Sequence, residues 1–244
     1  MKITNWNGYE KVEFQVGGRG SFLIRPKNSL PGNPWVWRTE FFGAFDYADR
    51  ALLEKGWHLA YHGVSDMYGC PESIEMMKEF YDVATTEYQM HTKPALFGFS
   101  RGGLYAFNFA LKYPECCSVL YLDAPVMDVR SWPAGLGAGC GASICWDQCK
   151  AIYGITNETV DRFTGNPLSH VKELADTGIP VIMVCGAADT VVPYEENGKP
   201  FYEEMVSYAA NIELILKPDC DHHPHSLVDP TPIVAFVERA FGAM

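Results

Sequence analysis

The stretch that decides the fold is Ala95-Leu96-Phe97-Gly98-Phe99-Ser100-Arg101-Gly102-Gly103, where a short apolar run leads into the pattern G-x-S-x-G. The apolar run predicts a short buried strand, and the residues after it, to Lys112, predict a helix stopped by Pro114. A serine at such a turn stands on strained backbone angles, and the flanking glycines let the strand and the helix approach closely. We therefore predict that Ser100 is a nucleophile, with the backbone N–H of Arg101 as one oxyanion donor.

The rest of the chain alternates between apolar strands and helices around this turn. The pattern predicts strands over 57–61, 95–99, 118–122, 181–185 and 212–216, and helices over 49–55, 73–88, 102–112 and 232–241. Such alternation is typical of a mostly parallel sheet with helices on both faces. Two runs at 12–16 and 21–25, joined by a glycine-rich turn, predict an antiparallel hairpin before it.

Residues 127–170 interrupt the alternation with glycines, cysteines and two tryptophans, one of them Trp132. We interpret this segment as a small cap over the carboxyl edge of the sheet, where ligands bind in α/β folds. A length of 244 residues suits one domain, so we expect residues 1–244 to form a single unit that includes the cap.

The composition excludes several classes of protein. The net charge is -11 and no Lys/Arg-rich run exists, which argues against a nucleic-acid or anionic-membrane partner. No targeting segment or membrane span is visible, so we expect a cytoplasmic protein whose eight cysteines are reduced thiols. No paired metal-ligand spacing occurs, and we expect neither a metal nor another cofactor. The oligomeric state stays open.

Together with the serine turn, two later segments resemble the α/β-hydrolase superfamily, in particular its serine esterases. The stretch Gly186-Ala187-Ala188-Asp189-Thr190-Val191-Val192-Pro193 is similar to the acid-bearing loop of that fold. The stretch Pro218-Asp219-Cys220-Asp221-His222-His223-Pro224-His225 is similar to its histidine loop, where G-x-G-H is usual. The resemblance implies an α/β-hydrolase fold and a Ser, acid, His order along the chain.

By this resemblance, His222 is the general base and Asp189 is the acid that orients it. Two alternatives stay open, because Asp123 also follows a strand and His223 is next to the expected base. Asp219 and Asp221 stand where the superfamily usually has glycines.

The substrate pocket is less well defined by the sequence. We expect the second oxyanion donor in the loop 27–32, at Lys27 or Asn28, although no H-G signature occurs there. Five aromatic residues lie close together in the sequence, and they belong either to the apolar core or to the substrate pocket: Trp35, Trp37, Phe41, Phe42 and Phe45. Of these we place Trp35 in the pocket, together with Trp132 and His225.

Two arginines, Arg38 and Arg101, are candidates to orient a polar or acidic substrate, and Arg101 is equally a candidate for a structural salt bridge. The aspartates and histidines of 219–225 also suggest a metal site, but neighbouring loop residues cannot all converge on one ion.

The sequence thus predicts a hydrolase that cleaves a carboxylic ester through an acyl-enzyme on Ser100. Within that class, the small-acyl ester of a carbohydrate or another polar alcohol is our expected substrate. Two other hypotheses are kept. One retains the nucleophile in an acyltransferase, thioesterase or peptidase, and the other is a binding protein that kept the fold without catalysis.

Overall fold

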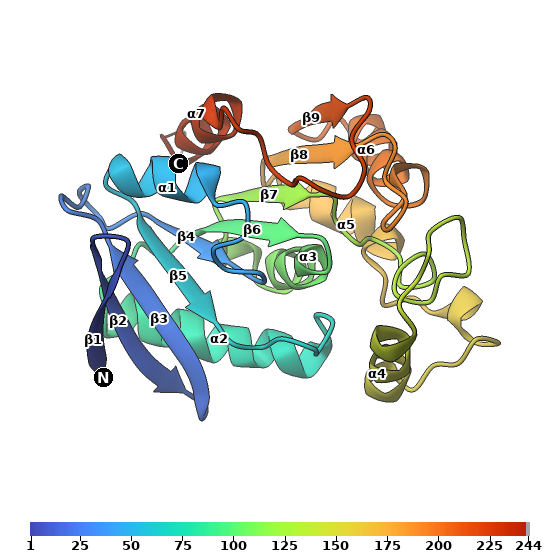
Figure 1. Ribbon diagram of the computed structural model, residues 1–244, viewed down its shortest axis with the longest axis horizontal. Coiled ribbons are helices and arrows are strands. Elements are labelled where there is room, and N and C mark those ends of the chain that lie inside the picture. Colours follow the sequence, from blue (N-terminus) through green and yellow to red (C-terminus); the bar gives the residue numbers. More distant parts are fainter. Residues whose placement is uncertain (243–244) are drawn as a thin grey trace.

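The computed structural model describes residues 1–242, in which nine strands form one sheet in the order β1-β2-β3-β5-β4-β6-β7-β8-β9 (Figure 1). The strands from β4 to β9 pair in parallel, and β1, β2 and β3 add an antiparallel edge. Their bounds are β1 Lys2–Trp6, β2 Tyr9–Val16, β3 Arg19–Arg25, β4 Trp35–Arg38, β5 His58–His62, β6 Ala95–Phe99, β7 Val119–Asp123, β8 Val181–Gly186 and β9 Ile212–Lys217.

Helices cover both faces of the sheet, as Figure 1 shows. The bounds are α1 Tyr47–Glu54, α2 Pro71–Thr86, α3 Gly102–Lys112, α4 Ser143–Tyr153, α5 Val171–Asp176, α6 Gly198–Ser207 and α7 Thr231–Gly242. One apolar core joins the sheet to α2, α3, α5 and α6 through residues such as Phe80 and Phe109. A second core joins the opposite face to α1 and α7, through residues such as Leu52 and Phe236. Burial on both faces explains why the central strands are almost wholly apolar.

The predicted fold class is confirmed, and the strongly periodic segments are strands or helices close to the expected bounds. Two strands were not predicted. The strand β1 is a polar, half-exposed edge strand without an apolar run. The strand β4 has only four residues, and its sequence resembles an aromatic cluster more than a strand. In the structure all four residues are buried, and the strand pairs with β5 and β6. The second omission matters for the site, because β4 sets which loop lies beside Ser100.

The segment 127–170 contains α4 and two short 3-10 helices, Val160–Arg162 and Pro167–His170, and Figure 1 shows α4 beyond the carboxyl ends of the parallel strands. It has its own apolar cluster, in which Trp132 and Trp146 pack with Tyr68 and Leu104 of the main body. The position of this segment agrees with the prediction that it lies at the carboxyl edge of the sheet. That it acts as a cap, and that residues 1–244 form a single domain, stay predictions.

A membrane-spanning segment would need a long apolar helix. Among the helices of residues 1–242, none has the length and apolar character to cross a bilayer.

Candidate active site

Ser100 lies at the sharp turn between β6 and α3. Its φ angle is 50°, in the left-handed region that costs a non-glycine residue energy. The turn is held by the Ser100 N–H, which donates to the carbonyl of Asp123 at 2.8 Å, and by its carbonyl, which accepts from Val126 at 3.0 Å. These bonds tie the serine to the end of β7, so the strained backbone is fixed by tertiary structure.

The glycines around Ser100 are required by close packing. A Cβ at Gly98 would lie 2.8 Å from the Cβ of Ala106 in α3, and one at Gly103 would lie 2.7 Å from Pro125. Real Cβ atoms do not approach other atoms so closely, because the repulsion rises steeply. Gly98 therefore allows the tight contact of β6 and α3, and Gly103 allows the contact of α3 with the loop after β7.

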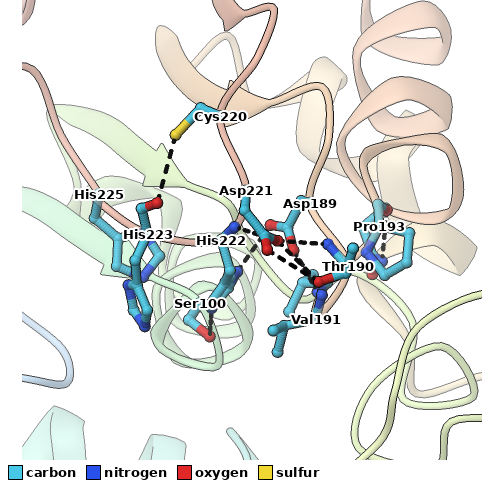
Figure 2. Close-up of polar contacts among 12 residues, drawn as sticks. Ser100, Asp189, Thr190, Val191, Pro193, Cys220, Asp221, His222, His223 and His225 are labelled. Carbon is cyan, nitrogen blue, oxygen red and sulfur yellow. Dashed lines mark hydrogen bonds and ion pairs between the residues drawn. The ribbon is translucent and has the colours of Figure 1, made fainter.

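The side chains of Ser100, His222 and Asp189 form one hydrogen-bonded chain (Figure 2). His222 Nε2 lies 3.0 Å from Ser100 Oγ, and His222 Nδ1 lies 2.8 Å from Asp189 Oδ2. A carboxylate only accepts, so Nδ1 carries the proton and Nε2 is free to accept one from the serine. All three residues are buried. The arrangement is that of a serine activated by an oriented imidazole.

The loops after β8 and β9 hold the acid and the histidine in place. The other oxygen of Asp189 accepts the backbone N–H groups of Val191 and Val192 at 2.9 and 2.8 Å. Asp221 Oδ1 accepts the N–H groups of Thr190 and His222, so it links the two loops. The N–H of Thr190, followed by that of His222, lowers the pKa of the Asp221 carboxyl group. The aspartate that replaces the usual glycine thus has a positioning function in this chain.

The two alternatives from the sequence have other partners. Asp123 Oδ1 lies 2.7 Å from Nδ1 of His225 and makes no bond to His222. His223 is exposed, stacks on Phe45 with ring centroids 5.4 Å apart, and contacts neither Ser100 nor Asp189 through a hydrogen bond. Burial against the loop, followed by the charges of its two histidine neighbours, lowers the pKa of His223. The geometry therefore favours Asp189 and His222.

A cavity of about 250 Å³ opens beside Ser100. Its lining is formed by Phe41, Ala44, Phe45, Phe99, Ser100, His222, His223 and His225. One wall is aromatic and comes from β6 and the loop after β4, and the other wall is the histidine loop. The placement of His225 in the pocket agrees with this lining. Phe41 and Phe45 belong to the aromatic cluster in the sequence, but which members of that cluster reach the site depends on β4.

The expected position of the second oxyanion donor was wrong. Lys27 and Asn28 precede β4, and the N–H of Leu30 in the same loop donates to the carbonyl of Gly56, in the turn before β5, at 3.0 Å. Because β4 and β6 are parallel, this loop lies at the amino ends of the strands, whereas Ser100 follows the carboxyl end of β6. Lys27 and Asn28 line a separate hollow with Tyr9, Leu53 and Glu54.

The loop that does approach Ser100 is the one after β4. A Cβ on Gly102 would lie 3.1 Å from Glu40 Cβ and 3.2 Å from Thr39 Oγ1. Phe41, the next residue, lines the cavity. The backbone N–H of Arg101 has no acceptor among the described residues, as expected for an oxyanion donor.

The tryptophans predicted for the pocket lie elsewhere. Trp35 is the first residue of β4, at the opposite end of the sheet from Ser100, and is fully buried. Its indole N–H donates to the carbonyl of His91 at 2.7 Å, and its ring stacks on Trp37. Trp132 packs beside Tyr68, with ring centroids 6.4 Å apart, and is not among the residues that line the cavity. Both residues belong to apolar cores.

The two arginines are held by carboxylates and do not line the cavity. Arg101 bonds Glu40 at 2.7 Å and Asp66 at 2.8 Å. Burial is the largest single effect and acts to lower the pKa of Arg101, but the charge and hydrogen bond of Glu40, together with the charge of Asp66, raise the pKa above its usual value. Arg38 makes a buried two-pronged ion pair with Asp49, at 3.1 and 2.6 Å. Of the two open functions of Arg101, the structure favours the salt bridge.

The side-chain nitrogens of His222, His223 and His225 lie within 4.8 Å of one another, which is the spacing of a candidate metal site. Both ring nitrogens of His222 are already bonded, and Nδ1 of His225 is bonded to Asp123. A metal would have to displace Ser100 or a carboxylate from this set. The donors present therefore fit a hydrogen-bonded site better than a metal centre.

The fold and the serine site define the class of this protein, a serine hydrolase of the α/β-hydrolase superfamily. More specifically, residues 55–243 match the model of the prolyl oligopeptidase family, and the chain belongs to that family. A search of curated protein sequences found no significant match.

Solved structures of similar fold include both peptidases and esterases. A puromycin-hydrolyzing peptidase of Mycobacterium tuberculosis superposes with a TM-score of 0.69 at 13% identity, covering 94% of this chain and 38% of its own. An esterase of Pyrococcus furiosus superposes with a TM-score of 0.66 at 17% identity, covering 98% and 97%. A lipase described as putative from Acinetobacter baumannii gives 0.64 at 13% identity, covering 97% and 93%. The chain thus spans about two fifths of that peptidase and nearly all of the esterase and the lipase.

Proposed function

We propose that this protein hydrolyses a carboxylic ester through an acyl-enzyme on Ser100. The observation that carries the proposal is the continuous hydrogen-bond chain from Ser100 through His222 to Asp189, at 3.0 and 2.8 Å, beside an open cavity. A serine hydroxyl becomes a good nucleophile when an oriented imidazole removes its proton.

The reaction proceeds in two halves. As Ser100 Oγ adds to the ester carbonyl, its proton passes to His222 Nε2, and the imidazolium is stabilised by Asp189. His222 then gives that proton to the departing alcohol oxygen, which leaves the acyl group on Ser100. In the second half, His222 takes a proton from water as the water oxygen adds to the acyl carbonyl. His222 then returns this proton to Ser100 Oγ as the bond between Oγ and the acyl carbon breaks and the carboxylic acid is released.

The negative charge on the tetrahedral oxygen is placed near the start of α3. The free N–H of Arg101 is the first donor, and we assign the second to the backbone of the loop after β4, between Glu40 and Phe42. This loop packs against Gly102 and carries Phe41 into the cavity wall. The helix dipole of α3 favours the same charge.

We infer a small acyl group and a polar alcohol as the substrate. A cavity of about 250 Å³ suits a short acyl chain better than a long one. Its histidine wall offers hydrogen bonds that a polar alcohol can use. The esterase and lipase similarities, which extend over nearly the whole of those chains, agree with ester cleavage by a domain of this size.

Peptide cleavage is the second candidate, because the family is defined by prolyl oligopeptidases and several similar structures are peptidases. Acyl transfer or thioester cleavage would use the same nucleophile. A protein that binds without catalysis would retain the fold but not a reactive serine.

The test has two parts. A fluorophosphonate should label Ser100 and fail to label Ser100→Ala, which separates an enzyme from a binding protein. In a separate assay, unlabelled wild-type enzyme is given p-nitrophenyl esters, acetylated sugars and peptide p-nitroanilides. We expect kcat/KM to be highest for short-chain esters. An anilide that exceeds every ester would make the protein a peptidase, and an alcohol acceptor that outcompetes water would make it an acyltransferase.

A further inference from the structure

Next to the cavity beside Ser100 lies a second aspartate–histidine pair, formed by Asp123 and His225, of which His225 lines the cavity. The Asp123 carboxylate accepts the hydroxyl of Tyr121 at 2.6 Å and the N–H of Ser226 at 2.8 Å, in addition to His225 at 2.7 Å. Three donors converge on one carboxylate, so His225 Nδ1 must carry its proton toward Asp123. The side chains are only 1% and 5% exposed. The imidazole of His225 is therefore fixed in orientation and in tautomer.

The other nitrogen of this ring is unused. His225 Nε2 makes no hydrogen bond within the described residues, and it is not among the buried atoms sealed from solvent. The residue lines the cavity of Ser100, and its ring centroid is 4.7 Å from that of His222. In Figure 2, His225 lies on the side of His222 opposite Asp189. In the neutral ring this nitrogen is a hydrogen-bond acceptor that faces the reaction site.

A purely structural function would use only the Nδ1 side of the ring. That side joins β7 to the histidine loop, and the N–H of Ser226 makes the same connection. This structural function does not explain why the unpaired Nε2 of His225 lies among aromatic rings. The ring centroids of Phe45 and Phe99 are 5.4 and 5.5 Å from that of His225. Because His225 Nε2 is open to the cavity, it can exchange water for a substrate hydroxyl group without breaking any hydrogen bond within the protein. His222 and His223 do not share this property, because one is fully bonded and the other is exposed.

We propose that His225 is a specificity-determining residue, whose Nε2 accepts a hydrogen bond from a hydroxyl group of the substrate close to the scissile ester. This inference rests on the proposed function of Ser100. The substrate class is a hydroxylated ester, with the hydroxyl within a few bonds of the reacting carbonyl. Asp123 acts through His225 as a positioning residue, since it holds the tautomer that leaves Nε2 an acceptor.

The experiment compares esters that differ only by one hydroxyl. Methyl butyrate and methyl 3-hydroxybutyrate test the acyl side, and ethyl acetate and 2-hydroxyethyl acetate test the alcohol side. Acid release in a pH-stat gives kcat/KM for each. We expect the wild type to favour the hydroxylated member of at least one pair by about tenfold or more. Comparing two substrates on one enzyme cancels any general loss of active protein.

Two variants separate substrate recognition from structure. His225→Asn keeps a donor for Asp123 but has no atom at the position of Nε2, so the preference should fall to about onefold. His225→Gln places an amide near that position and should restore part of the preference. A structural function alone would change stability or both rates together, without changing the ratio.

Fluorophosphonate labelling of Ser100 distinguishes a failure of the proposed function from a failure of the inference about His225. A wild type that is not labelled would refute the proposed function itself. A labelled wild type without a preference in either pair, or a preference that survives in His225→Asn, would overturn the inference about His225.

Discussion

Asp221 Oδ1 accepts the backbone N–H of Thr190 at 2.7 Å and that of His222 at 2.8 Å, and so joins the loop of the acid to the loop of the base. The link crosses from the end of β8 to the end of β9, two neighbouring strands. The distance between Asp189 and His222 therefore depends on a third side chain that has no direct part in the chemistry.

We expect Asp221→Ala to lower kcat by roughly ten- to a hundredfold while the fold persists, because a small displacement of the base is costly. Asp221→Asn keeps the oxygen that accepts both N–H groups and should retain most of the rate. Asp219→Ala is the matched control, since Asp219 is exposed and makes no side-chain hydrogen bond among residues 1–242. Ester kinetics with circular dichroism provide the measurement. Equal rates for all three variants would contradict the positioning function.

The two candidate acids should differ in what their loss affects. Asp189→Asn should lower kcat by roughly 10³- to 10⁴-fold, because an amide favours the wrong tautomer of His222. Asp123→Asn should affect turnover of a simple ester far less and should lower the melting temperature, since three donors lose part of their acceptor. Rate and melting temperature are measured for both variants. The reverse outcome would assign the acid to β7.

The buried ion pair of Arg38 and Asp49 should be important for stability. The two side chains are 0% and 2% exposed. Asp49→Ala should reduce the free energy of unfolding by about 3–5 kcal/mol, because it leaves a buried guanidinium without its partner. Asp82→Ala, which breaks the exposed pair with Lys78, should cost about 0.5 kcal/mol or less. Urea denaturation followed by tryptophan fluorescence tests this difference. Similar losses of unfolding free energy for the two variants would show that burial does not determine how much the ion pair of Arg38 and Asp49 contributes to stability.

Two buried histidines make stability depend on pH. Burial lowers the pKa of both His58 and His62 to about 4, from 6.5 in the unfolded chain. Below pH 6.5 both histidines become protonated in the unfolded chain, whereas in the folded protein they stay neutral until the pH approaches 4. Stability is then complete above pH 6.5 and falls toward pH 4, with a slope that approaches 1.4 kcal/mol per pH unit for each residue.

Urea denaturation at pH 7.5, 6.5 and 5.5 measures this slope. A double variant, His58→Gln with His62→Gln, should unfold with a clearly flatter pH dependence over the same range, even if its stability at pH 7.5 is lower. An unchanged slope would mean that other groups cause the loss.

Chelators should leave the activity unchanged. In the histidine cluster, His222 uses both ring nitrogens and His225 uses Nδ1 in bonds to protein side chains. The proposed reaction needs no Lewis acid, because the oxyanion is stabilised by backbone N–H groups. Overnight dialysis against EDTA, followed by an ester assay with and without added zinc, is sufficient. Activity that disappears on dialysis and returns with zinc would refute the metal-free mechanism.

The prediction of the second oxyanion donor was wrong because the strand β4 was not recognised in the sequence. The segment 35–38 has four residues and no period of its own that distinguishes a strand from an aromatic cluster. Its partners are β5 and β6, with Trp35 opposite His58 and Val36 opposite Ala95. Without this strand, the loop at Lys27 and Asn28 was assigned to the wrong end of the sheet. The loop after β4, to which we assign the second oxyanion donor, could not be recognised from the sequence because it has no H-G motif.

The sequence by itself determined the fold class, the sharp turn that carries Ser100, and the order of Ser100, Asp189 and His222 along the chain. These features are local, because a strand, its turn and the residue just after it lie within about ten positions and have a characteristic period. Tertiary structure alone decided the distant partners of Asp123 and Arg101. Asp123 meets His225 across 102 positions, and Arg101 meets Glu40 across 61. Such pairs depend on how distant strands and loops are brought together, and no local pattern records it.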